Sequence, residues 1–129
     1  MFEKIQLFRL AQGLATHAAA RQSAIAQNVA NADTPGYRAK DVAPFSQAYQ
    51  SGGRESLRTS RPGHVLRGGE TGARWPVQEA YRPGTMSPNG NNVSLETEMM
   101  MSAAAQQEHE LALTVYRSAL TILRTSLGR

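Results

Sequence analysis

The two ends of this 129-residue chain carry helical periodicity, and the segment between them does not. In residues 5–32, apolar side chains recur at three- and four-residue steps, which is the spacing of one face of an α-helix. They are Leu7, Leu10, Ala11, Leu14, Ala18, Ile25 and Val29. Residues 95–127 repeat the pattern with Met99, Ala103, Leu111, Leu113, Val115, Tyr116, Ala119, Leu120, Ile122, Leu123 and Leu127. The sequence therefore predicts one long helix at each end.

These two helices are the only predicted elements with substantial apolar faces, so they are expected to pack on each other. Because they lie at opposite ends of the chain, the central segment must loop out and return, and the fold is predicted to be mainly α with an antiparallel coiled-coil hairpin. Alanine dominates the middle of the first helix, which allows a close approach of the partner. The expected helix-packing residues are Leu7, Leu14, Ile25, Leu113, Tyr116, Leu120 and Leu123.

The central segment is rich in residues that break regular structure. Residues 45–92 hold eight of the eleven glycines and four of the six prolines, so this region is predicted to be loop with short β-strands at most. Residues 64–67 and 74–79 are the candidate strands, with Val65, Leu66, Trp75 and Val77 as a half-buried patch. We expect residues 1–36 and 93–129 to form a discontinuous helical core and residues 37–92 a separate central unit.

The start of the second helix is marked by polar residues. Ser94 is placed to cap the first free N–H groups, and Glu96 and Glu98 bring negative charge to the positive end of the helix dipole. With Asn92 and Met99, Ser94 and Glu96 are the candidate residues at this start. The run of methionines at 99–101 is explained either by packing in the first turns, partly against other subunits, or by an adaptable contact surface.

The second helix has more apolar surface than one partner can cover. Between residues 111 and 123, apolar residues occupy more than one stripe of the helix. Each large apolar side chain left in water forgoes about 1.5–3 kcal/mol. An isolated copy is therefore expected to be only marginally ordered, and helices from other copies are expected to complete the core.

Composition argues against several classes of function. There is no cysteine, and His17, His64 and His109 are too far apart for a metal pair, so no metal, cofactor or catalytic site is expected. We expect His17 and His109 to be solvated or hydrogen-bonded between helices. The formal charge of +4 comes from scattered lysines and arginines, which disfavours nucleic-acid binding. No apolar run is long enough for membrane insertion, and the first residues lack the pattern of a cleaved secretory signal.

The end of the first helix carries more chemistry than a helix stop needs. The sequence NVANADTPGY places Asn28 and Asn31 three residues apart on one helical face, within reach of free carbonyl groups or another chain. Asp33 and Thr34 suit a side-chain-stabilised turn, and Pro35-Gly36 suits a chain reversal with a positive φ at the glycine. Together with Tyr37, these residues are the candidate assembly motif, a fixed joint between the first helix and the outgoing segment.

Two blocks of the chain carry a family resemblance. Residues 22–41 resemble the N-terminal signature of the bacterial flagellar rod, hook and hook-associated axial proteins, and the ADTPGY form is most similar to the proximal rod proteins. Residues 90–99, GNNVSLETEM, are similar to the block that opens the C-terminal helix of the same family, and residues 59–64 weakly resemble a patch in its middle. The chain departs from the family in its Gly- and Arg-rich centre and in the MSAAAQQ stretch at 101–107.

The resemblance implies a structural subunit and no enzyme. It implies a place in the rod of the flagellar basal body, the drive shaft that crosses the periplasm and transmits torque from motor to hook, after type III export without a cleaved signal. The implied partners are other copies, rod proteins of the FlgC, FlgF and FlgG types, the adapter protein FliE, the MS-ring protein FliF and the flagellar export apparatus. A rod protein of the FlgC type ranks second, and a non-flagellar helical binding module ranks third.

Overall fold

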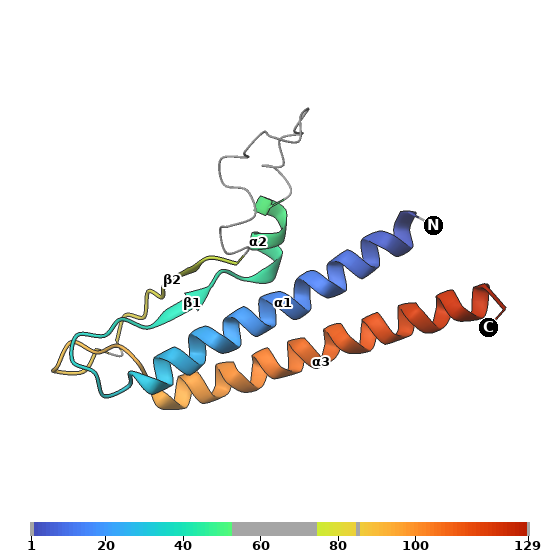
Figure 1. Ribbon diagram of the computed structural model, residues 1–129. Helices are drawn as coiled ribbons and strands as arrows, with labels where there is room; N and C mark the ends of the chain where they lie inside the picture. Colours follow the sequence, from blue (N-terminus) through green and yellow to red (C-terminus); the bar gives the residue numbers. More distant parts are fainter. Residues whose placement is uncertain (1, 53–74, 85, 129) are drawn as a thin grey trace, which may run out of the picture.

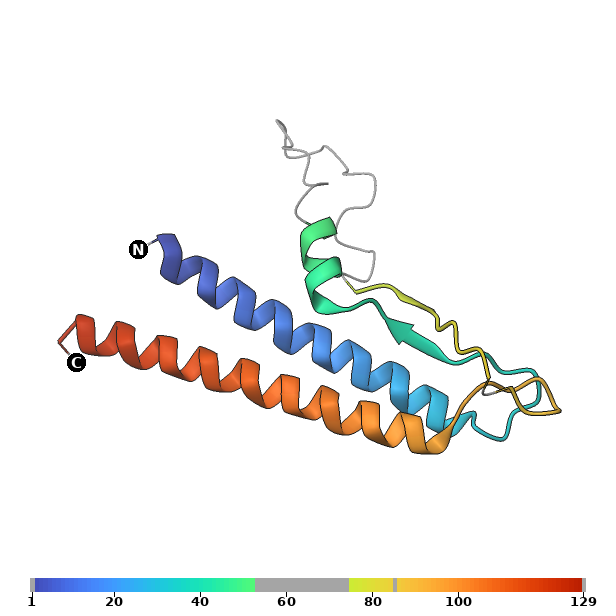
Figure 2. The same ribbon diagram turned by 180° about the vertical axis from the view of Figure 1, so that it is seen from behind.

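The computed structural model describes residues 2–52, 75–84 and 86–128. Within them, five elements follow one another: α1 (Phe2–Ala30), β1 (Lys40–Val42), α2 (Phe45–Gly52), β2 (Val77–Glu79) and α3 (Leu95–Ser126). In Figures 1 and 2, α1 and α3 lie side by side along their whole length, with the two termini at the same end. The mainly α fold and the antiparallel pairing of the terminal helices are confirmed.

Alanines at seven-residue spacing form the seam of the hairpin. On α3 the buried apolar residues are Ala105, Ala112 and Ala119, and on α1 the series Ala11, Ala18 and Ile25 has the same spacing. A repeat of seven keeps the same face of each helix toward its partner, as in a coiled coil. Small side chains in this seam let the two backbones come close together, while they leave the larger residues on either side only partly covered.

The prediction that one partner cannot cover α3 is confirmed. More than a third of the surface of several large apolar side chains remains exposed on α3, among them Leu111, Leu113, Tyr116 and Ile122. On α1, Ile5, Leu7 and Leu10 are similarly exposed near the N-terminus. None of the helices in the described ranges is long and apolar enough to span a membrane.

Two short strands pack beside α1. β1 and β2 are antiparallel, with Lys40 opposite Glu79, Asp41 opposite Gln78 and Val42 opposite Val77. The strand expected at 74–79 is present but shorter, and Val77 is 45% exposed whereas Trp75 is buried just before the strand. The candidate strand at 64–67 and the family-like patch at 59–64 lie outside the described residues. The division of the chain into a helical core and a separate central unit stays a prediction.

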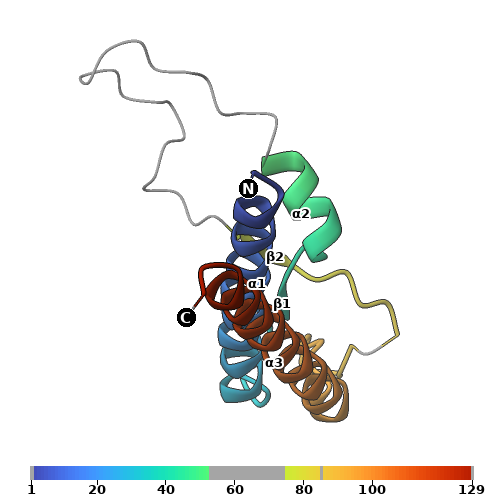
Figure 3. The same cartoon turned by 90° about the vertical axis from the view of Figure 1, so that its right-hand side faces the viewer.

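The prediction of loop for residues 45–52 was wrong, because α2 occupies them. This helix is held to α1 by aromatic contacts that are distant in sequence: the Phe45 ring lies 5.5 Å from the His17 ring and 5.7 Å from the Trp75 ring. Gly13 of α1 leaves room for both aromatic rings. In Figure 3, which shows the molecule with its termini toward the viewer, α2 lies beside α1.

The expectation that His17 is solvated or bonded between the long helices was also wrong. His17 is 1% exposed, and its Nε2 donates to the backbone carbonyl of Ala43 at 2.7 Å, in the connection between β1 and α2. The edges of its ring meet Trp75 at 5.1 Å between centroids. His17 therefore fixes the central segment on α1, a role that its position in a long helix does not reveal.

Candidate functional site

Asn28, in the last turns of α1, is the centre of a buried polar cluster. Its side chain is fully buried, and its Nδ2 donates to the Lys40 carbonyl at 2.7 Å while its Oδ1 accepts from the Lys40 N–H at 2.8 Å. Oδ1 also accepts from the Tyr37 hydroxyl at 3.3 Å. The two bonds to Lys40 are those that a neighbouring strand would make, so Asn28 closes the edge of β1 that faces away from β2.

The same amide reaches a buried carboxylate on α3. Asn28 Nδ2 donates to Glu98 Oε2 at 3.1 Å, and the Arg82 guanidinium donates to Glu98 Oε1. Glu98 is fully buried, and the Arg82 side chain is 12% exposed. A buried carboxylate is tolerated only when it is paired and hydrogen-bonded. Glu98 lies in the first turn of α3, where the sequence predicts negative charge, and it also connects α1, α3 and the segment after β2.

Asn91, just before α3, closes the end of α1. Its Nδ2 lies 3.0 Å from the carbonyl oxygen of Asn31 and 2.8 Å from those of Ala32 and Thr34. These carbonyl groups belong to the turn that follows α1, so the Asn91 amide attaches this turn to the segment that leads into α3. Its Oδ1 accepts from the Val93 N–H at 2.8 Å, which fixes the entry to α3.

Asn92, one residue later, also links the start of α3 to the segment that follows α1. Its Oδ1 accepts from the backbone N–H of Ala39 at 2.6 Å, and its own N–H donates to the Tyr37 carbonyl at 3.4 Å. Both Asn91 and Asn92 are buried. We use the name joint for the cluster of Asn28, Tyr37, Arg82, Asn91, Asn92 and Glu98.

The turn after α1 has the geometry that its sequence predicts. The Tyr37 N–H donates to the Thr34 carbonyl at 3.3 Å across Pro35 and Gly36, and Gly36 has φ = 73°. Proline at the second position and a glycine with positive φ at the third are typical of a type II turn. The Gly36 N–H donates to the Asn89 carbonyl at 2.9 Å, so the turn is attached to the segment that leads into α3.

Comparison of the sequence with known proteins finds similarity to one family. The family model of the flagella basal body rod proteins matches residues 8–38, which include most of α1 and the turn. The flagellar basal body rod protein FlgB of Agrobacterium fabrum is 31% identical over 121 residues, 90% of this chain and 88% of that protein. FlgB of Cereibacter sphaeroides is 29% identical over 108 residues, 83% of this chain and 82% of the relative.

The chain belongs to the FlgB family. It is therefore a structural protein of the flagellar basal-body rod and not an enzyme. Among the described residues, no group of three histidine, aspartate or glutamate side chains could hold a metal ion. The hydrogen bonds and the ion pair of the joint hold α1, β1 and α3 together.

The structure separates the residues of the candidate motif. Asn28 and Tyr37 belong to the joint, whereas Asn31 is half-buried and donates from Nδ2 to the Gln27 carbonyl of its own helix at 2.8 Å. The Thr34 hydroxyl lies 3.3 Å from Asn31 Oδ1. The remaining members, Asp33, Pro35 and Gly36, are exposed at the tip of the turn.

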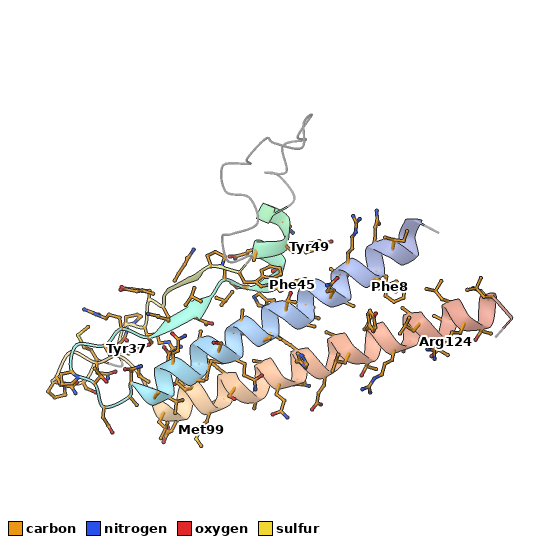
Figure 4. All side chains as sticks on the ribbon, viewed as in Figure 1. Phe8, Tyr37, Phe45, Tyr49, Met99 and Arg124 are labelled. Carbon is orange, nitrogen blue, oxygen red and sulfur yellow. The ribbon has the colours of Figure 1, made fainter. Side chains whose placement is uncertain are left out.

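The candidate residues at the start of α3 are separated in the same way. Asn92 lies in the joint, while Glu96 is exposed and Met99 is 65% exposed. Figure 4 shows Met99 pointing away from the hairpin. Ser94 has the extended conformation of an N-cap residue, but its side chain makes no capping hydrogen bond, so the predicted cap contact was wrong.

The candidate helix-packing residues differ in burial. Ile25 is buried, and Leu14, Leu120 and Leu123 are half-buried. Leu7, Leu113 and Tyr116 are each more than a third exposed. The Tyr116 ring meets the edge of Phe8 with 5.2 Å between centroids, and Figure 4 shows Phe8 on the side of α1 that faces α3.

Sequence reasoning missed three members of the joint, namely Arg82, Asn91 and Glu98. Asn91 and Glu98 both lie in the GNNVSLETEM block, but the candidates predicted within it are Asn92, Ser94, Glu96 and Met99. Arg82 had no such signal, because it is one of several arginines in the central segment. Its contact with Glu98 is what identifies it in the structure.

Proposed function

We propose that this chain is a subunit of the proximal rod, the part of the drive shaft that crosses the periplasm and transmits torque from motor to hook. The observation that supports this best is the unequal coverage of the hairpin. β1 and α2 cover α1 on the side away from α3, while large apolar residues toward the termini are exposed on both helices, among them Ile5 and Leu10 on α1 and Leu111 and Ile122 on α3. A shaft built of many copies supplies the missing cover.

The energetics favour such an assembly. Each large apolar side chain that a neighbour buries contributes about 1.5–3 kcal/mol. Contacts between different surfaces of successive copies do not close on themselves and give open tubes instead of dimers. The terminal half of the hairpin is suited to contacts of this kind, because its exposed residues lie on both sides of the alanine seam.

We infer the neighbours from the family and not from a contact in this structure. They are other copies of the chain, rod proteins of the FlgC, FlgF and FlgG types, the adapter protein FliE and the MS-ring protein FliF. Delivery through the flagellar type III export apparatus fits a chain whose terminal helices gain most of their cover after arrival, because ordering is then coupled to binding.

In this function the assembly motif and the start of α3 act together. Asn28, Asn31, Asp33, Thr34, Pro35, Gly36 and Tyr37 hold the angle between α1 and the outgoing segment. Replacing Asn31 or Gly36 should abolish rod assembly and swimming while export of the subunit remains detectable. Normal swimming with both substitutions would contradict this role of the motif.

The function itself is tested on the exposed face of α3. Ile122 is 56% exposed, so Ile122→Glu should leave the helix content of the free subunit equal to that of the parent but remove rods from basal bodies viewed by electron microscopy. Thr121→Glu adds the same charge at the neighbouring exposed position and should assemble. If cells with Ile122→Glu build normal rods and swim, neighbours do not use this face.

The free subunit gives a second test. Its helix content by circular dichroism should be well below that expected from the assembled rod, with the loss in the terminal half of the hairpin. Amide hydrogen exchange should then be slow near the joint and fast toward both termini. A free monomer that is fully helical and unfolds in one cooperative step would contradict the need for neighbours.

A further inference from the structure

The second half of α3 carries a surface that the hairpin does not use. Leu113, Arg117, Leu120, Arg124 and Leu127 follow one another at steps of four and three residues. Residues at these steps are neighbours on one side of a helix. We call this set the leucine–arginine stripe. Leu113 is 38% exposed, both arginines are exposed, and Leu127, which directly follows the last residue of α3, is 76% exposed.

Except at Leu120, which is half-buried, the described part of the chain leaves this stripe open. β1 packs on α1, and Figures 1 and 2 show α2 and the strands on the side of α1 that faces away from α3. Figure 4 shows Arg124 on the side of α3 opposite to α1. The ion pairs within the described residues involve Arg21 and Arg82, and neither arginine of the stripe has an acidic partner among them.

Charge indicates what the stripe binds. Residues 111–129 contain Arg117, Arg124 and Arg129 and no aspartate or glutamate. A row of leucines bordered by arginines is typical of helices that lie in the surface of an anionic membrane, where leucine enters the acyl boundary and arginine reaches the phosphate groups. We propose that the leucine–arginine stripe binds the surface of an anionic phospholipid bilayer when the subunit is free.

A two-fold pair of free subunits fits the stripe less well. Pairing of two stripes by a two-fold axis would bring the arginines of both copies together, and residues 111–129 offer no acid to compensate them. The helix is also not apolar enough to span a bilayer. Binding along the surface, parallel to the membrane plane, satisfies both observations.

The experiment is sedimentation of the full-length subunit with vesicles. Vesicles of equal parts phosphatidylglycerol and phosphatidylcholine should carry the protein into the pellet, and phosphatidylcholine vesicles should not. Arg117→Gln with Arg124→Gln should lower the partition coefficient roughly thirtyfold. Arg117→Lys with Arg124→Lys should bind nearly as the parent does, and 0.5 M salt should weaken binding of the parent.

The matched control removes the same charge elsewhere. Arg38 and Lys40 are both exposed near β1, and Arg38→Gln with Lys40→Gln should lower binding far less than the pair on the stripe. Circular dichroism of each variant checks that its helix content equals that of the parent. Equal binding to neutral vesicles, or equal losses for the two glutamine pairs, would overturn the proposal. So would a dimer that the stripe variant dissociates, in a protein that does not sediment with vesicles.

Discussion

Asn28 should be the most sensitive single position of the joint. Asn28→Ala removes the partner of the Lys40 N–H and carbonyl and one of the two partners of the Glu98 carboxylate. A lost bond to a buried charged group costs about 1.5–3 kcal/mol, and each neutral group left unpaired costs about 1–3 kcal/mol. Since water can reach part of Lys40, we expect a loss of about 4 kcal/mol in the free energy of unfolding.

The assay is urea unfolding followed by the fluorescence of Trp75, which reports on the part of the free subunit near the joint that we expect to stay ordered. This is the only tryptophan in the chain, and it is buried against His17 and Phe45 on the same side of α1 as the joint. With a urea dependence of about 1.5 kcal/mol per molar, the midpoint should fall by more than about 2 M.

Two further variants distinguish the effect of the lost hydrogen bonds from the effect of the lost side-chain volume. Asn28→Asp keeps the shape of the side chain but places an oxygen where Nδ2 donates to Glu98, so it should destabilise at least as much as Asn28→Ala. Asn31→Ala removes an asparagine that is half-buried and bonds within its own helix, and should cost only about 1 kcal/mol. If Asn28→Ala and Asn31→Ala have the same midpoint, the buried cluster does not hold the joint as argued.

Two glycines give opposite predictions. Gly90 has φ = 81°, and a Cβ there would lie 3.5 Å from the Gly36 Cα. Gly90→Ala should therefore lower the free energy of unfolding by about 1–2 kcal/mol in the urea assay. An unchanged urea midpoint would show that the turn adapts. Gly13 lies inside α1, where a Cβ would meet the Phe45 ring at an ordinary contact distance of 3.5 Å. Gly13→Ala should therefore raise the free energy of unfolding by about 0.5–1 kcal/mol. A lower urea midpoint would indicate a tighter aromatic contact than the structure has.

Local sequence was sufficient for the long helices and insufficient for the central segment. Apolar periodicity is a property of each helix alone, so α1 and α3 could be predicted within a few residues of their ends. α2 is short, and its contacts are with His17 and Trp75, which lie far away along the chain. When such contacts decide the structure of a segment, its own composition gives no reliable indication.

The position of the joint along the chain could be predicted from the sequence, but the hydrogen-bond partners of its residues could not. The turn at Pro35-Gly36 depends on neighbouring residues, and its geometry agrees with the sequence. Asn28 depends on Lys40, twelve residues away, and on Glu98, seventy residues away. A pairing over these separations exists only after the hairpin has formed, so the sequence could mark Asn28 as important without identifying its partners.

The joint and the terminal half of the hairpin have different roles in the subunit. Hydrogen bonds are directional, so the buried amides and the Arg82–Glu98 pair fix how α1, β1 and α3 meet within one chain. Apolar contact is not directional, and the exposed residues toward the termini can be covered by neighbours that differ in detail. A rod needs both properties, because each copy must have the same shape while its neighbours change along the shaft. Substitutions at the joint should therefore alter the shape of every copy, whereas substitutions on the terminal half should affect particular neighbours.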